Sequence, residues 1–186
     1  MPKLISILYR KYLYIVCGNV SVEFFVWGRI MKKREEIKVV VIGSSDVGKT
    51  TLMESLIGSI GKVEHRGITT AIDYGSLTVD NKKIHFFGTP GQKRFEFMRD
   101  LTLKGTTLAL VVLDASKGIT EEDIEIVRSL ESKNIPYGIF INKTDIKKID
   151  LDEVNKYFSP KFVIEGSALK KEGLKELLSC LLNDHF

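Results

Sequence analysis

The sequence has few residues of several types, and each shortage excludes a class of protein. Among 186 residues there are two cysteines and three histidines, too few for a disulfide framework and without metal-ligand spacing. Neither a Ser-His-Asp order nor a carboxylate pair indicates hydrolytic chemistry of those kinds. The longest uncharged run has 11 residues, 12–22, whereas a membrane-spanning helix needs about 20. These shortages favour a protein of the reducing cytoplasm.

The net charge of +4 is unevenly distributed along the chain. Residues 1–34 hold seven basic side chains and one acidic side chain, a net charge of +6. The remaining 152 residues hold 21 basic and 23 acidic side chains, a net charge of −2. Because a nucleic-acid-binding surface must be basic enough to neutralise phosphates, we expect no nucleic-acid partner for this larger part.

The charge distribution divides the chain into a basic, hydrophobic N-terminal extension, 1–34, and one domain, 35–186. Three interpretations of the extension stay open. It lies on an anionic membrane surface, which would make the protein peripheral to the membrane; it is a structured extension of the domain; or it is upstream translation, with the native start at Met31.

From residue 37 onward, apolar strand patterns alternate with amphipathic helix patterns. The expected strands are 37–42, 72–79, 83–87, 107–113, 137–141 and 162–165. A tight turn joins the second and third of them and predicts an antiparallel hairpin. The pattern predicts an α/β fold: a mostly parallel six-stranded sheet with helices on both faces and one antiparallel edge strand. Ligands of such sheets bind at the carboxyl ends of the strands.

Helices are expected to begin near Thr50, Thr120, Leu151 and Leu174. The helix after Thr120 has a capping sequence. It is expected to place Ile124, Val127 and Leu130 on its inner face.

A phosphate-binding loop follows the first expected strand. Residues 43–50 match the pattern GxxxxGK[ST]. The two glycines let successive N–H groups point at phosphate oxygens. Lys49 supplies a cation for the β- and γ-phosphates, and the Thr50 hydroxyl can ligate Mg²⁺. The residues expected to bind the nucleotide here are Gly43, Ser44, Ser45, Asp46, Val47, Gly48, Lys49, Thr50 and Thr51.

A second motif, Asn142-Lys143-Thr144-Asp145, follows the expected strand 137–141. The Asp145 carboxylate can accept the N1 and 2-amino hydrogens of guanine, which adenine does not offer. With this motif after the phosphate loop, the chain resembles the Ras-like small GTPases of the P-loop NTPase class, over residues 37–186.

The resemblance implies roles for the residues around the base. Asn142 would brace the phosphate loop and Lys143 would lie along the base. After the last strand, Ser167, Ala168 and Leu169 would complete the guanine site, with the Ala168 N–H at guanine O6.

Residues 85–92 resemble the family's DxxGQ element, which senses the γ-phosphate. Gly91 would donate its N–H to that phosphate, and Gln92 would orient the attacking water. Gly88 stands where most of the family carries the carboxylate that holds Mg²⁺ through water. The resemblance therefore implies a weaker metal site, resting on Thr50, one switch threonine and the phosphates.

Register assigns that threonine to Thr69, four residues before Asp73, as in Rab- and Arf-like members. Arg66 lies three residues before Thr69, the spacing of the built-in arginine of heterotrimeric G-protein α subunits. Such an arginine stabilises transition-state charge. A solvated loop arginine is the alternative.

The spelling FGTPGQ at 87–92, with TTAIDYG at 69–75, resembles the prokaryotic MglA-like GTPases, which work with roadblock-type partners. It implies a protein effector or activator. Ser45 occupies a loop position that is glycine in Ras, where a side chain crowds a partner's catalytic finger. We therefore expect slow hydrolysis.

These motifs predict a cytoplasmic GTP/GDP-binding switch with Mg²⁺ as cofactor. A partner protein is expected to recognise its switch regions, 61–71 and 88–100. The catalytic residues are expected to be Gln92, Lys49 and Arg66, and the metal ligands Thr50 and Thr69. A GTP-binding scaffold with negligible hydrolysis is the alternative. A P-loop kinase or ATPase is a further one, against which Asp145 argues.

Overall fold

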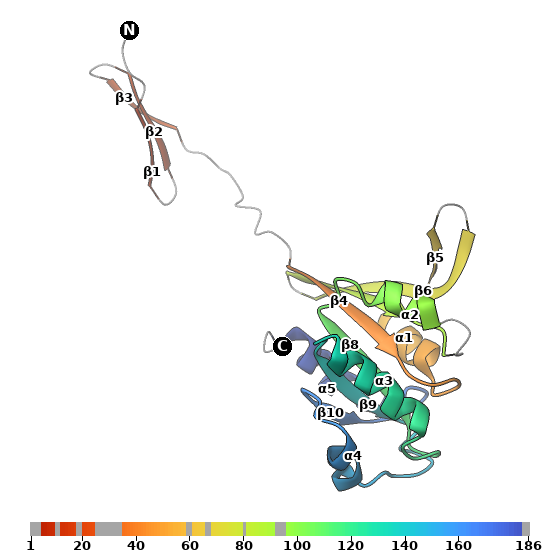
Figure 1. Cartoon of the computed structure of the whole chain (residues 1–186). Coiled ribbons are helices and arrows are strands. Elements are labelled where there is room, and N and C mark those ends of the chain that lie inside the picture. Colours follow the sequence, from red (N-terminus) through yellow and green to blue (C-terminus); the bar gives the residue numbers. More distant parts are fainter. Residues whose placement is uncertain are drawn as a thin grey trace. The chain divides into compact units, whose positions relative to one another are not determined.

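A computed structural model describes residues 5–9, 12–17, 20–24, 35–58, 61–65, 68–79, 81–91 and 96–183 (Figure 1). The chain forms two compact units, Met1–Arg34 and Glu35–Phe186. In the first unit, an antiparallel three-stranded sheet joins β1 (Ile5–Tyr9), β2 (Tyr12–Cys17) and β3 (Val20–Phe24). No helix among the described residues has the length and apolarity to cross a membrane.

The second unit is built on one sheet with the strand order β10-β9-β8-β4-β7-β6-β5. Its strands are β4 (Glu35–Ile42), β5 (Gly61–His65), β6 (Ile68–Val79), β7 (Lys82–Gly88), β8 (Leu108–Asp114), β9 (Tyr137–Asn142) and β10 (Val163–Glu165). The pairs β10–β9, β9–β8, β8–β4 and β4–β7 are parallel, and β6 runs antiparallel to β7. The predicted α/β fold is confirmed. The short strand β5 pairs with β6 beyond the six strands that the sequence predicts.

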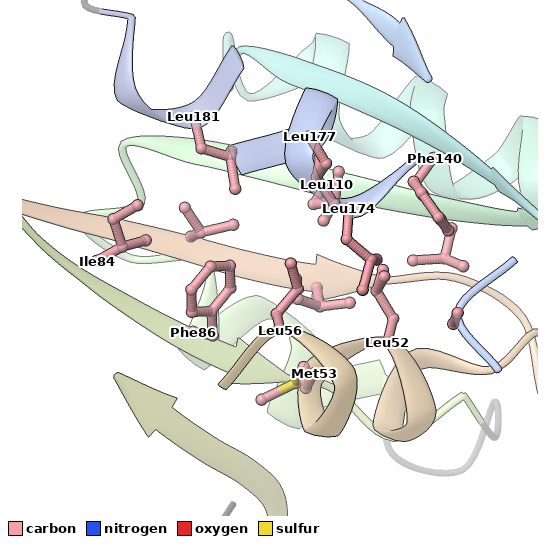
Figure 2. Close-up of a cluster of buried hydrophobic side chains, with 14 of the residues drawn as sticks. Leu52, Met53, Leu56, Ile84, Phe86, Leu110, Phe140, Leu174, Leu177 and Leu181 are labelled. Carbon is pink, nitrogen blue, oxygen red and sulfur yellow. The ribbon is translucent and has the colours of Figure 1, made fainter. Parts of the chain in front are cut away.

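Helices cover both faces of this sheet, because alternate strand residues point to opposite faces. The described helices are α1 (Lys49–Ile57), α2 (Glu96–Thr102), α3 (Glu121–Ser132), α4 (Leu151–Tyr157) and α5 (Leu174–Leu182). On one face, α1 and α5 pack over residues such as Phe86 and Leu110, as Figure 2 shows. On the other face, α3 and α4 pack over a second buried cluster.

The helix α3 begins as its sequence predicts. Thr120 and Asp123 form a capping box, in which the Thr120 hydroxyl accepts from Asp123 N and the Asp123 carboxylate accepts from Thr120 N. Val127 and Leu130 are buried as expected, but Ile126 rather than Ile124 is the third fully buried hydrophobic residue of α3. Ile124 packs at the margin of the cluster, because the helix turns a broader apolar stripe toward the sheet.

The carboxyl ends of the parallel strands meet at one edge of the sheet. The phosphate-binding loop follows β4, and Asn142 at the end of β9 lies opposite Asp114 at the end of β8. The strand β7 ends at Gly88, next to Val41 of β4. The fold therefore brings the described motifs to one place.

Candidate nucleotide-binding site

The phosphate-binding loop bends sharply where it enters α1. Gly48 has a φ of +95°, in the left-handed region that favours glycine, and a Cβ there would lie 2.4 Å from Asn142 Nδ2. The Lys49 ammonium donates to the carbonyl oxygens of Gly43 at 3.0 Å and Ser44 at 2.7 Å. The loop thus folds around its own lysine.

The ammonium of Lys49 is poorly solvated. Burial lowers its pKa to about 8, and the nearby Arg99 guanidinium adds to this effect. Three carboxylates raise the pKa in opposition: Glu122, Asp46 and Asp73. A phosphate anion beside Lys49 would stabilise the charged form that burial disfavours.

Asn142 links the phosphate loop to the last loop of the site. Its Nδ2 donates to Val47 O at 2.8 Å, and its Oδ1 accepts from Ala168 N at 2.9 Å. The side chain is buried, so both bonds are shielded from water. In this structure, the Ala168 N–H that the sequence analysis assigns to guanine O6 is thus engaged by Asn142.

Lys143 is held across the site by two acceptors. Its Nζ donates to Asp46 O at 2.8 Å and forms an ion pair with Asp114 Oδ2 at 2.6 Å. Burial raises the pKa of Asp114, but hydrogen bonds from Lys143 and Ser116 outweigh it, so the net pKa lies below its ordinary value. Lys117 Nζ also donates to Ser45 O, at 3.3 Å.

Asp145, the residue expected to recognise the base, carries a negative charge. A hydrogen bond from the Ser167 side chain lowers the pKa of Asp145, and Lys170, whose Nζ lies 3.4 Å from Asp145 Oδ2, contributes in the same direction. The carboxylate is therefore ionised at neutral pH and acts as an acceptor only.

A cleft of about 290 Å³ lies between these loops. It is lined by Gly48, Thr51, Asn142, Lys143, Asp145, Ile146, Ser167 and Leu169. Leu169, 80% exposed, and Ile146, 69% exposed, are the most exposed of the described large hydrophobic side chains. A flat apolar face in the cleft would cover them.

Gly91, which is expected to contact the γ-phosphate, lies against the phosphate-binding loop. A Cβ at Gly91 would be 2.8 Å from both Lys49 Nζ and Ser45 N, so only glycine fits this approach. Thr69 belongs to β6, opposite Glu64 of β5. The expected catalytic residues Gln92 and Arg66 lie outside the described residues.

The donor set at the start of α1 suits Mg²⁺. The Thr50 hydroxyl lies on the exposed side of the loop and donates to the Asp73 carboxylate at 2.7 Å. Hydroxyl and carboxylate oxygens are ligands of hard cations. Among the described residues, no group of three or more His, Cys, Asp or Glu side chains could hold a metal ion by itself, so an ion here would need phosphate oxygens as well.

Two charged residues of the site, Arg99 and Asp114, were not predicted from the sequence. Arg99 is 8% exposed, and in the described part of the chain its Nε and Nη2 atoms have no hydrogen-bond partner. A buried cation with two unsatisfied nitrogen atoms, close to Lys49, suits an anionic ligand. A helical arginine carries no sequence signal for this. Asp114 does carry one, because it is a carboxylate directly after a buried strand.

Comparisons with known proteins agree with this geometry. The model of the 50S ribosome-binding GTPase family matches residues 38–143. An uncharacterized protein of Methanocaldococcus jannaschii, MJ1339, is 71% identical over 151 residues, which cover 81% of this chain and 98% of that protein. Translation initiation factor IF-2 of Mycoplasmopsis synoviae is 31% identical over 77% of this chain, which spans about a quarter (26%) of that factor.

A solved structure supports the same assignment. The G domain of the FeoB iron transporter of T. maritima has a TM-score of 0.65 and 26% identity, covering 80% of this chain and 98% of that domain. The chain therefore belongs to the 50S ribosome-binding GTPase family and contains a GTP-binding G domain of the P-loop fold.

Proposed function

We propose that the protein is a molecular switch that binds GTP and GDP and slowly hydrolyses GTP. The observation that carries this proposal is the shared cleft, in which Gly48 and Thr51 of the phosphate loop face Asp145 across one cavity. A ligand that fills it has phosphates at one end and a base at the other.

Guanine is the base that this cleft supports. The ionised Asp145 accepts the guanine N1–H and 2-amino hydrogens, whereas adenine offers it neither of these two donors. The exposed side chains of Ile146 and Leu169 offer apolar surface to the faces of a base. The aliphatic part of Lys143 offers more of it while Asp114 holds its ammonium.

The hydrolytic mechanism follows from groups around the γ-phosphate. Water attacks the γ-phosphorus in line, and the bond to the β-phosphate oxygen breaks. Lys49, the loop N–H groups and the Gly91 N–H stabilise the developing charge, with Gln92 placing the water. Mg²⁺, held by Thr50 and, in the GTP state, by Thr69, would neutralise charge shared by the β- and γ-phosphates. The buried guanidinium of Arg99 is a further cation for this charge, beside the role proposed for Arg66.

The switch regions 61–71 and 88–100 are proposed to signal the nucleotide state to a partner. The FGTPGQ spelling supports an MglA-like placement with a roadblock-type partner. The family's name and the IF-2 relative instead support a ribosomal partner, but the −2 net charge of residues 35–186 offers no basic field for RNA. We therefore favour a protein partner in the cytoplasm, with membrane-surface contact through residues 1–34 as the alternative.

A scaffold that binds GTP without turnover is the second candidate. It is favoured by Gly88, which supplies no carboxylate for the metal. It is also favoured by Ser45, whose backbone N–H lies close to Gly91. Single-turnover hydrolysis of GTP by the wild type and by Gln92→Ala separates the two. The switch predicts a measurable wild-type rate that falls at least about tenfold in the variant. Equal rates near zero, with and without cell extract, would establish the scaffold.

A further inference from the structure

A carboxylate from a distant strand reaches the phosphate loop. Asp73 of β6 accepts the hydrogen bond of the Thr50 hydroxyl at 2.7 Å. P-loop NTPases hold Mg²⁺ with the loop's Ser or Thr and with a carboxylate from a neighbouring strand. The strand β7, which runs beside β4, ends in Gly88 and supplies no carboxylate.

The strand register explains why Asp73 can take this place. Gly88 lies directly opposite Asp73 and beside Val41, so the three positions form one row across β6, β7 and β4. Residues in such a row point to the same face, here the face that α1 covers. A Cβ at Gly88 would lie 2.8 Å from Met53 Sδ and 3.2 Å from Asp73 Cβ. Side chains at 88 and 73 therefore compete for one space, and glycine leaves it to Asp73.

Two other candidates for the metal are placed less well. Asp114 is engaged by Lys143 and Ser116, each at 2.6 Å, on the base side of the site. Thr69 lies four residues from Asp73 along β6, which is about 13 Å at the rise of a strand. In this conformation of β6, the backbone of Thr69 therefore lies far from the Thr50–Asp73 contact.

We propose that Asp73 is the carboxylate of the Mg²⁺ site, replacing from β6 the group that β7 lacks. The Thr50–Asp73 hydrogen bond uses the hydroxyl proton, which leaves oxygen lone pairs of Thr50 for the ion. The nucleotide phosphates supply further oxygens. This inference rests on the proposed nucleotide binding. It assigns the metal a protein carboxylate, which residues 85–92 do not supply because they have Gly88 at the usual position.

The test measures metal affinity, with Mn²⁺ as the spectroscopic probe. The full chain is loaded with GDP and titrated with Mn²⁺, and free Mn²⁺ is followed by electron paramagnetic resonance. Asp73→Asn keeps the size of the side chain and an acceptor for Thr50, but it removes the charge. We expect its Kd for Mn²⁺ to rise at least about tenfold. Glu153→Gln, at an exposed position on α4, is the matched charge control and should leave the Kd unchanged within about twofold.

An exchange variant tests the location of the carboxylate. Asp73→Gly combined with Gly88→Asp moves the charge one strand across, about 4.8 Å, with the flexible Met53 side chain yielding space. The proposal expects this variant to recover most of the Mn²⁺ affinity that Asp73→Asn loses. It also decides the question by the same titration if Asp73→Asn does not fold.

Two results would overturn the inference. One is an unchanged Mn²⁺ Kd in Asp73→Asn with a lowered Tm, which would make Asp73 only a negative charge near the start of α1, whose first turn has no acidic residue. The other is an equal loss in Glu153→Gln, which would mean a long-range charge effect. GDP binding by the wild type is therefore measured separately, in EDTA and with Mg²⁺. If the wild type binds GDP in neither condition, the proposed function itself is contradicted, and not only the inference about Asp73.

Discussion

Lys49 links nucleotide binding to pH. Its pKa is about 8 in the nucleotide-free protein because burial disfavours the charged form. Phosphates favour the charged form of Lys49 and therefore raise its pKa in the complex. Between these two pKa values, binding takes up a proton, so we expect GDP affinity to be constant below about pH 8 and to fall as the pH rises above it. Calorimetric titrations in buffers of different ionisation enthalpy would detect the proton uptake.

Lys49→Arg is the control for this pH dependence. An arginine stays protonated over the whole range, so its GDP affinity should not fall between about pH 8 and about pH 9.5 through this group. A decline of equal steepness in both proteins would show that another group titrates.

Asn142 holds two loops together through bonds that water cannot replace. Its replacement by alanine leaves Val47 O and Ala168 N without their partner. We expect Asn142→Ala to lower the free energy of unfolding of the nucleotide-free protein by about 2–4 kcal/mol, measured by urea denaturation. Asn155→Ala, exposed on α4, is the control and should change it by less than about 0.5 kcal/mol. Similar losses of unfolding free energy in the two variants would mean that the two hydrogen bonds of Asn142 do not stabilise the protein.

At the scale of elements, we expect the segment around Gly91 to distinguish the two nucleotide states. A methyl group at position 91 would meet Lys49 Nζ and Ser45 N, each at 2.8 Å. We expect Gly91→Ala to lower the affinity for a non-hydrolysable GTP analogue at least about tenfold and that for GDP less than about threefold, because GDP has no γ-phosphate for this segment to approach. Competition with a fluorescent nucleotide measures both.

Gly61→Ala is the matched control for that prediction, because a Cβ there meets no atom within 4 Å. Equal losses for GDP and the GTP analogue in Gly91→Ala would show that the segment does not discriminate between them.

The β5–β6 hairpin was the hardest element to predict from the sequence. Apolar runs in the sequence predict the parallel strands, and the capping box predicts the start of α3. The strand β5 has no apolar pattern, and its pairing with β6 comes from backbone bonds at a sheet edge. The same limit applies within the site. Sequence patterns predict Lys49 and Asp145, but the Thr50–Asp73 contact depends on which strand lies beside β7, and the burial of Arg99 depends on how α2 packs.

At the scale of the whole molecule, residues 35–186 form a compact unit that we expect to fold and bind GDP without residues 1–34. Residues 35–186 alone should match the full chain in GDP Kd within about twofold and in Tm within a few degrees. Failure of the truncated protein to fold would instead make residues 1–34 a structural part of the domain.

The central claim is that the cleft between the phosphate loop and Asp145 selects guanine. Calorimetric titration of the full chain with GDP and with ADP, in Mg²⁺, for wild type and Asp145→Asn, tests it most directly. The account predicts that the wild type binds GDP at least about 100-fold more tightly than ADP, and that Asp145→Asn loses most of this difference, because a charged acceptor of two hydrogen bonds is removed. Equal affinities of the wild type for GDP and ADP would contradict it.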